Sequence, residues 1–202
     1  MRNNEASLAR TLLIWSVLLL VLGVPIIAAG FSPQLQWRDP IYIIAGFAGV
    51  ISLCLLLVQP LLIGEYLPSL SPPNYRRLHR WVGGSLVAAV IIHVAALYLT
   101  SPPDVIDALL LASPTPFSIW GVIAMWAVFA TAILAALRKR IRLKPKTWRI
   151  GHLALAIVII IGSVVHALLI EGTMEMMSKV VLCVLVILAG ARVIVRQMRL
   201  IN

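Results

Sequence analysis

Charged residues are scarce in this sequence. Asp, Glu, Lys and Arg make up 12% of its 202 residues, and only seven residues are acidic. A soluble domain carries about 25% charged residues, so this chain lacks the polar surface that a water-soluble fold needs. Its longest polar stretches are short loops, which excludes an additional soluble domain.

Cysteine is also rare, and the positive charge is not arranged for nucleic acid. The only two cysteines, Cys54 and Cys183, each lie inside an apolar run. We therefore expect buried free thiols and no disulfide framework. The net charge of +10 comes from residues at the ends of apolar runs, where they set membrane topology. Nucleic acid is therefore not an expected partner.

Long apolar runs are what the sequence has instead. Hydrophobic residues make up 61% of the chain, in runs close to the roughly 20 residues that cross a hydrocarbon core about 30 Å thick. The sequence predicts an all-α polytopic membrane protein with one domain over residues 1–202 and six transmembrane helices in a bundle. The predicted spans are approximately 9–30, 40–66, 76–100, 117–138, 147–170 and 174–195.

Proline and glycine separate these spans. Proline lacks the N–H that a helix needs and clashes with the preceding turn, so its clusters indicate breaks. The predicted breaks are at Pro33, Pro68, Pro72-Pro73, Pro102-Pro103, Pro114, Pro116, Pro145 and Gly172.

The first span has an alternative interpretation as a secretory signal peptide. Arg2 and Arg10 precede an apolar run that ends in Ala28-Ala29-Gly30. This run is long for a signal peptide and no clean A-x-A cleavage site follows it, which favours a retained helix. The remaining spans keep their direction in either case.

Lys and Arg predict the orientation of the chain. Fifteen of the 17 lie on one side of the predicted membrane, and only Arg38 and Lys179 lie on the other. The fifteen are Arg2, Arg10, Arg76, Arg77, Arg80, Arg138, Lys139, Arg140, Arg142, Lys144, Lys146, Arg149, Arg192, Arg196 and Arg199. Because positive residues are retained in the cytoplasm, both termini are predicted to be cytoplasmic, with the protein in a membrane such as the bacterial inner membrane.

All four histidines lie in two spans and share one spacing. His79 and His93 are in the third span, and His152 and His166 are in the fifth, each pair fourteen residues apart. Fourteen residues is four turns of a helix in left-handed packing, so each pair lies on one face, about 21 Å apart along the axis at about 1.5 Å rise per residue.

The two histidine-bearing spans run in the same direction, which matches the depths of their histidines. His79 and His152 then form an inner pair near the cytoplasmic side, and His93 and His166 form an outer pair. Two facing histidine pairs, one above the other, are typical of two six-coordinate b hemes. The alternative is that each histidine only donates a hydrogen bond to a neighbouring helix, although ionisable residues in spans are rare and face the bundle interior.

Residues near the histidines fit a heme but have ordinary explanations as well. Small residues can give a porphyrin clearance or serve helix packing; they are Gly83, Gly84, Gly151, Gly162 and Ser163. Arginines at the level of the inner pair can bind heme propionates or act only as topogenic charge. We take Arg80 and Arg149 as the candidate propionate partners; Arg76 and Arg77 lie at the same level.

Two segments resemble the ferric reductase-like transmembrane domain family, which includes ferric reductases, NADPH oxidases and the heme-binding subunit of periplasmic methionine sulfoxide reductase. They are R-R-L-H-R-W-V-G-G-S-L-V-A-A-V-I-I-H at 76–93 and W-R-I-G-H-L-A-L-A-I-V-I-I-I-G-S-V-V-H at 148–166. The resemblance implies two b hemes, ligated by His79 with His152 and by His93 with His166. It also implies electron flow from a cytoplasmic donor outward. The cytochrome b of quinol–cytochrome c reductases carries similar histidine pairs but has a different helix count.

The sequence departs from the larger members of this family. Ferric reductases and NADPH oxidases continue into a flavin- and nicotinamide-binding region, whereas this sequence ends at Asn202 and contains no G-x-G-x-x-G run. We therefore expect a standalone member that takes electrons from a separate flavoprotein reductase or from quinol. The expected acceptor is a periplasmic oxidoreductase, ferric iron or oxygen.

Two function classes follow from this pattern. The first is a bis-heme, cytochrome b-type electron-transfer subunit in membrane lipid, without catalytic residues of its own. The second is a heme-less scaffold or permease subunit with structural histidines. The spans lack the central charged residues that ion-coupled carriers usually show, which favours the first class.

Overall fold

The computed structural model describes residues 2–200, with side chains from Leu8 onward. Met1 and residues 201–202, which the predicted domain range includes, lie outside the described residues, as does the side chain of Arg2. Every regular element in the described part of the chain is helical. The predicted all-α class is therefore confirmed.

Six long helices in residues 2–200 have the length and apolar composition to cross a membrane, as predicted. The elements are α1 (Arg2–Gly30), a 3₁₀ turn η1 (Pro33–Leu35), α2 (Pro40–Ile63), α3 (Pro72–Thr100), α4 (Pro102–Leu109), α5 (Pro116–Leu137), α6 (Pro145–Leu169) and α7 (Met176–Arg199). The short helix α4, which connects α3 to α5, was not predicted.

Proline is the first residue of most helices in this chain. Five helices have proline as their first residue: Pro40, Pro72, Pro102, Pro116 and Pro145. The first position of a helix has no intrahelical use for an N–H, and proline's fixed φ is already helical. The predicted breaks at four of these prolines, all but Pro40, are confirmed, and each of the four is the first residue of the helix that follows the break. Helix α3 begins four residues earlier than expected.

Two other helix boundaries also differ from the predictions. The second span was predicted to reach residue 66, but α2 ends at Ile63 and Glu65 has a φ of 57°, which no helix accommodates. The last helix begins at Met176 instead of residue 174. Glu175 caps α7 by accepting hydrogen bonds from the backbone N–H groups of Ser178 and Met177, and these bonds hold the pKa of its carboxyl below its usual range.

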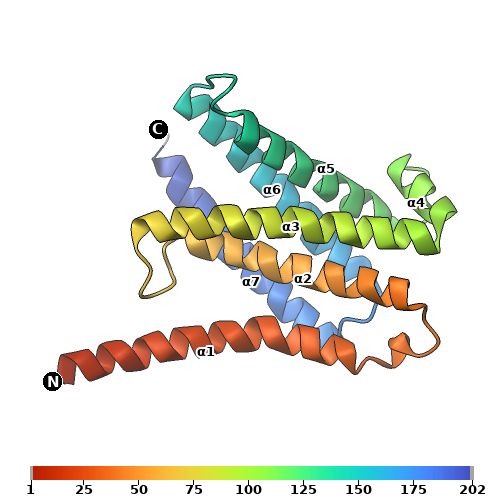
Figure 1. The fold of residues 1–202 in the computed structure, drawn as a ribbon, viewed down its shortest axis with the longest axis horizontal. Coiled ribbons are helices and arrows are strands. Elements are labelled where there is room, and N and C mark those ends of the chain that lie inside the picture. The colour runs from red at the N-terminus through yellow and green to blue at the C-terminus, as the bar shows by residue number, and fades with distance from the viewer. Residues whose placement is uncertain (1, 201–202) are drawn as a thin grey trace.

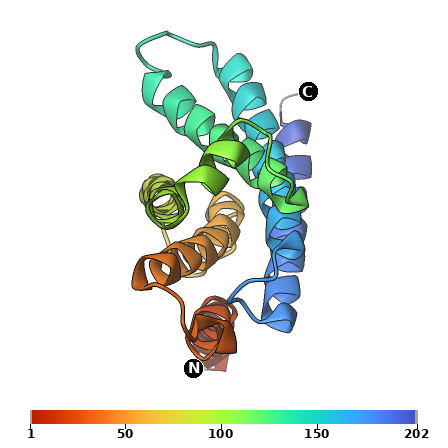
Figure 2. The ribbon, with the colours of Figure 1, turned by 90° about the vertical axis from the view of Figure 1, so that its right-hand side faces the viewer.

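The long helices form two antiparallel hairpins. α2 packs closely on α3, α5 packs closely on α6, and α7 contacts both α2 and α6. Figures 1 and 2 show α1 at the edge of the bundle, away from α5 and in contact with α2 and α7. Both described ends of the chain, the α2–α3 loop and the α5–α6 loop lie at one end of the bundle in Figure 1; we call it the basic end.

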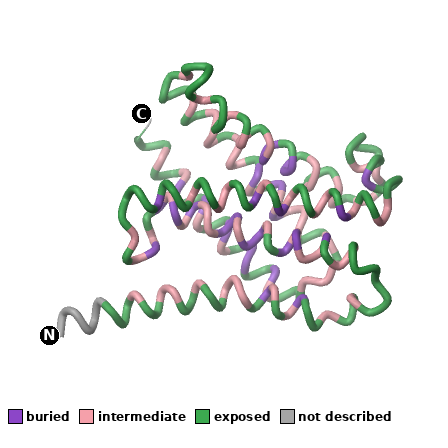
Figure 3. The backbone as a smooth tube through the Cα atoms, viewed as in Figure 1, coloured by how far each residue is buried: buried purple, intermediate pink, exposed green. Residues whose placement is uncertain are grey.

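Burial is concentrated where α2, α5, α6 and α7 meet (Figure 3). Three of the four largest fully buried side chains belong to α7; they are Leu182, Cys183 and Val186, each at most 1% exposed. The described part of helix α1 is mostly exposed or half-buried (Figure 3), and several of its exposed side chains are leucines, as expected for a helix with lipid on most of its surface. Cys54 and Cys183 are buried and free, as predicted.

Candidate functional site

The structure brings the four histidines together as two pairs between α3 and α6. The ring centres of the inner pair, His79 and His152, lie 6.3 Å apart, and those of the outer pair, His93 and His166, lie 6.4 Å apart. The ring planes are inclined by 69° and 84°. α3 and α6 both start at the basic end (Figure 1), so the pairs lie at two successive levels along the bundle.

This spacing fits one metal ion between the rings of each pair. Two imidazole nitrogens bound to one metal ion at about 2.0–2.1 Å each put the ring centres roughly 6 Å apart, because each centre lies about 1 Å behind its nitrogen. Edge-to-face aromatic pairs also have centres about 4.5–7 Å apart. The distance is therefore compatible with shared ligation and with simple ring contact.

The hydrogen bonds of the outer pair fix which nitrogen can bind a metal. His93 Nδ1 lies 2.7 Å from the carbonyl oxygen of Ala45 on α2, and His166 Nδ1 lies 2.9 Å from the carbonyl oxygen of Phe117 on α5. A carbonyl only accepts, so each Nδ1 carries the proton and donates it. Nε2 of each neutral ring is then the nitrogen with a free lone pair, as a metal ligand requires.

The inner pair is held differently. Nδ1 of His79 and Nδ1 of His152 are buried and have no hydrogen-bond partner among the described residues. The ring of His152 stacks on Trp148, with centres 5.1 Å apart and planes inclined by 19°, and the Arg138 guanidinium lies 4.2 Å from the Trp148 ring centre. Stacking thus orients His152, where carbonyl groups orient the outer rings.

A buried amide also lies at the level of the inner pair. Gln59 of α2 places its amide nitrogen 3.4 Å from the backbone carbonyl oxygen of His79. Its Oε1 has no partner within the described part of the chain. Gln59 was not predicted as a site residue, although an amide inside an apolar run is the signal that would have identified it.

Most of the small residues near the histidines serve helix packing. A Cβ at Gly162 would lie 3.0 Å from Cβ of Ala124 and from the carbonyl oxygen of Trp120, both on α5. One at Gly151 would contact Leu134 of α5 at 3.5 Å, and one at Gly83 would contact Gln59 of α2 at 3.1 Å. Gly162 and Gly83 thus allow close packing within their hairpins, whereas the contact at Gly151 is an ordinary one and Gly84 has open space around it.

The two histidine-bearing helices stay apart despite their facing rings. Each packs tightly on its own hairpin partner, but the backbones of α3 and α6 make next to no close approach within residues 2–200. The facing histidine rings bridge this interval. A helix pair separated in this way is the arrangement that a flat prosthetic group between two axial imidazoles requires.

The two candidate propionate partners lie at the rim of the bundle. Arg80 follows His79 directly, Arg149 lies three residues before His152, and both side chains are exposed. They are at the level of the inner pair, as expected from their positions in the sequence. Exposure leaves both free to reach a bound acidic group.

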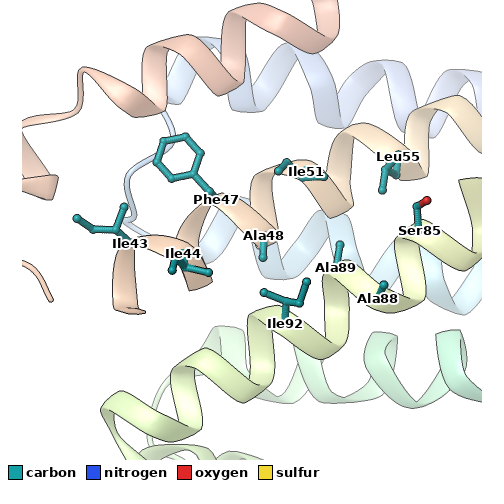
Figure 4. Close-up of a pocket in the computed structure, with 10 residues that line it drawn as sticks. All are labelled: Ile43, Ile44, Phe47, Ala48, Ile51, Leu55, Ser85, Ala88, Ala89 and Ile92. Carbon is teal, nitrogen blue, oxygen red and sulfur yellow. The ribbon is translucent and has the colours of Figure 1, made fainter. Parts of the chain in front are cut away.

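An apolar groove of about 590 Å³ runs between α2 and α3 (Figure 4). Phe47, Ile51, Ala89 and Ile92 are among its lining residues, and Ser85 is the one polar side chain in it. None of the four histidines lines it. The groove has the character of a lipid-facing surface and is separate from the histidine pairs.

Comparison with known proteins identifies one family. The sequence model of the ferric reductase like transmembrane component matches residues 44–163, which is well over half of the chain. The matched segment begins in α2 and ends in α6 shortly before His166. No curated protein and no solved structure matches the sequence.

Proposed function

We propose, from the premise that this chain belongs to the ferric reductase-like transmembrane family, that it is a bis-heme electron-transfer subunit. Membership of the family, together with six apolar helices, indicates a role in electron transfer at a membrane. The finer proposal is that His79 with His152 and His93 with His166 are the axial ligands of two b hemes.

The observation that carries the proposal is the pairing of the histidines. The only four in the sequence meet as two pairs with nearly equal ring-centre distances, 6.3 and 6.4 Å. Both pairs lie between helices whose backbones stay apart. Separate structural histidines would have no reason to repeat one spacing at two levels.

Each residue has a defined task in this proposal. His93 and His166 present Nε2 because carbonyl groups hold their Nδ1 protons. Trp148 orients His152 by stacking, and Arg80 and Arg149 bind propionates at the basic end. When bound, the hemes supply one-electron carriers at two depths, and the apolar side chains of the bundle keep water away from them.

Electrons would enter at the basic end, which the distribution of Lys and Arg predicts to be cytoplasmic. We propose a flavoprotein reductase or membrane quinol as the separate donor. The acceptor at the opposite end would be a periplasmic oxidoreductase, ferric iron or oxygen.

One observation favours a second candidate, a heme-less scaffold or permease subunit. The Nδ1 hydrogen bonds of His93 and His166 already tie α3 to α2 and α6 to α5, as purely structural histidines would. In that case the histidines contribute stability and give no visible spectrum.

The deciding experiment is a visible spectrum of the purified protein, oxidised and dithionite-reduced, with a heme-to-protein ratio. We expect the bands of low-spin heme b at about two hemes per chain. His93→Ala or His166→Ala should each remove the outer heme, and His79→Ala or His152→Ala the inner one. Trp126→Ala, a change at an exposed aromatic residue of α5, is the control. Full heme content in all four histidine variants would refute the ligand assignment.

A further inference from the structure

Two glycines that no motif identifies lie directly against the outer histidine rings. A Cβ built at Gly49 of α2 would lie 3.2 Å from both Nδ1 and Cε1 of His93. One built at Gly121 of α5 would lie 2.6 Å from Nδ1 and 2.7 Å from Cε1 of His166. A Cβ atom at Gly121 could not remain 2.6 Å from the His166 ring. The absence of a side chain at each glycine therefore lets the imidazole approach the helix backbone.

The carbonyl group that each ring bonds lies one turn before the glycine on the same helix. Ala45 precedes Gly49 by four residues, and Phe117 precedes Gly121 by four. Residues four apart share one helix face, so each ring meets a carbonyl oxygen and a bare backbone position together. A carbonyl oxygen has two lone pairs and can accept from the imidazole while it keeps its helical hydrogen bond.

This arrangement occurs twice, on two different helices. α2 provides it for His93 and α5 for His166. The inner pair lacks it, because Nδ1 of His79 and of His152 has no partner among the described residues. The arrangement is therefore specific to the outer level of the bundle.

We propose that Gly49 and Gly121 are positioning residues for the outer heme. Each forms, with the carbonyl group one turn before it, a seat that fixes the tautomer and the ring plane of one axial histidine. This inference rests on the proposed function, since it requires His93 and His166 to be ligands. A donated Nδ1–H also makes Nε2 a more basic ligand, which stabilises the oxidised iron and lowers the reduction potential of the outer heme.

The test compares Gly49→Ala and Gly121→Ala with Gly23→Ala in the purified protein. Gly23 is a glycine in the membrane helix α1, away from the histidine-bearing helices, with nothing within 4 Å of an added Cβ, so it is the matched control. Alanine is the better helix former by about 1 kcal/mol, and intrinsic helix propensity therefore favours every variant. A loss of heme or a shifted potential in the two seat variants, Gly49→Ala and Gly121→Ala, then reports the contact between the added methyl group and the histidine ring.

The two contacts predict a graded result. At Gly121 the 2.6 Å approach cannot be relieved by a small shift, so Gly121→Ala should lower the heme-to-protein ratio from about two to about one. At Gly49 the ring needs to move only slightly, so Gly49→Ala should keep both hemes and weaken the Nδ1–H bond. Its outer heme should then show a more positive midpoint potential in a redox titration.

A second signature comes from the ring planes. The outer rings are inclined by 84°, and near-perpendicular axial planes give a strongly anisotropic low-spin ferric electron paramagnetic resonance signal. Gly49→Ala should shift this signal towards a more rhombic one as the His93 ring turns. The inner heme signal and the Gly23→Ala spectrum should be unchanged.

The possible outcomes separate the inference from the proposed function. Two hemes with unchanged potentials and signals in both seat variants would overturn the inference and leave the function intact. Loss of the outer heme from Gly23→Ala as well would also overturn it, because any added methyl group would then have the effect. If Gly121→Ala misfolds and loses both hemes, the redox titration of Gly49→Ala decides whether the inference holds. A wild-type protein without heme would overturn both proposals.

Discussion

At the scale of the residue, each outer histidine uses its two ring nitrogens for different purposes. Nδ1 donates to a backbone carbonyl group on the neighbouring helix, and Nε2 remains available as a ligand. The sequence identified these histidines because ionisable residues inside apolar spans are rare. It could not identify Ala45 and Phe117 as acceptors, because every residue has a carbonyl group and only packing selects one.

Trp148 is the residue expected to matter most for the inner pair after the ligands themselves. Its indole stacks on the His152 ring, and the Arg138 guanidinium lies over the indole. Trp148→Leu should lower the affinity of the inner site for heme about 10-fold to 100-fold, the usual effect of losing an outer-shell partner. Heme titration of the stripped protein measures this.

The control for this change is Trp126→Leu. Trp126 is 58% exposed on α5 and its nearest aromatic partner is Phe129, not a histidine. It should leave both affinities unchanged. An inner site that binds heme equally well with and without Trp148 would show that stacking does not position His152.

Lys179 is a buried cation at the end of the bundle opposite the basic end. It is 3% exposed, and its Nζ donates to the carbonyl oxygen of Ile170 at 2.6 Å. Lys179→Met should destabilise the protein by about 1–3 kcal/mol, because it leaves that carbonyl without its charged donor. Thermal unfolding in detergent measures the change, with heme content unaffected.

The comparison for Lys179 is Lys146→Met, which removes the same charge from an exposed position. Its effect should lie within about 0.5 kcal/mol, as for most surface changes. Equal stability of the two variants would mean that the Lys179 hydrogen bond does not hold α7 to the end of α6.

At the scale of the element, the two hairpins decide where the histidines lie. α3 is fixed by α2 and α6 by α5, so a change inside a hairpin moves a histidine-bearing helix as a whole. The sequence predicted all six helices because long apolar runs have one stable form in lipid. It misplaced several starts, since proline is equally compatible with a break and with the first turn of a helix.

Gly162 tests how closely the second hairpin must pack. An added Cβ there would lie 3.0 Å from Cβ of Ala124 and from the Trp120 carbonyl oxygen, so α5 and α6 would have to separate. Gly162→Ala should cost about 1–3 kcal/mol of stability through overpacking. Gly151→Ala in the same helix makes an ordinary 3.5 Å contact with Leu134 and should be tolerated. Thermal unfolding of both variants checks this, and equal midpoints would contradict it.

At the scale of the whole molecule, charge and fold agree on two distinct ends. The described termini and the loops that hold most of the Lys and Arg share the basic end in Figure 1. The positive-inside rule predicts that this end faces the cytoplasm.

Cysteine labelling in cells measures the orientation. In a background with Cys54→Ala and Cys183→Ala, a thiol introduced by Ala112→Cys lies in the α4–α5 loop, and one introduced by Lys139→Cys lies in the α5–α6 loop at the basic end. A membrane-impermeant maleimide should label the first in intact cells and the second only after permeabilisation. The reverse pattern would invert the proposed direction of electron flow.

The sequence by itself determined the class, the six helices, the four histidines and their pairing by depth. These are properties of segments: a length that matches the bilayer, a charge at a helix end, and a spacing of whole turns along one helix. The tertiary structure decided which residues of different helices contact one another. It selected the carbonyl groups of Ala45 and Phe117, the glycines at 49 and 121, and the stack on Trp148, because contacts between helices depend on rotation and register that no single segment encodes.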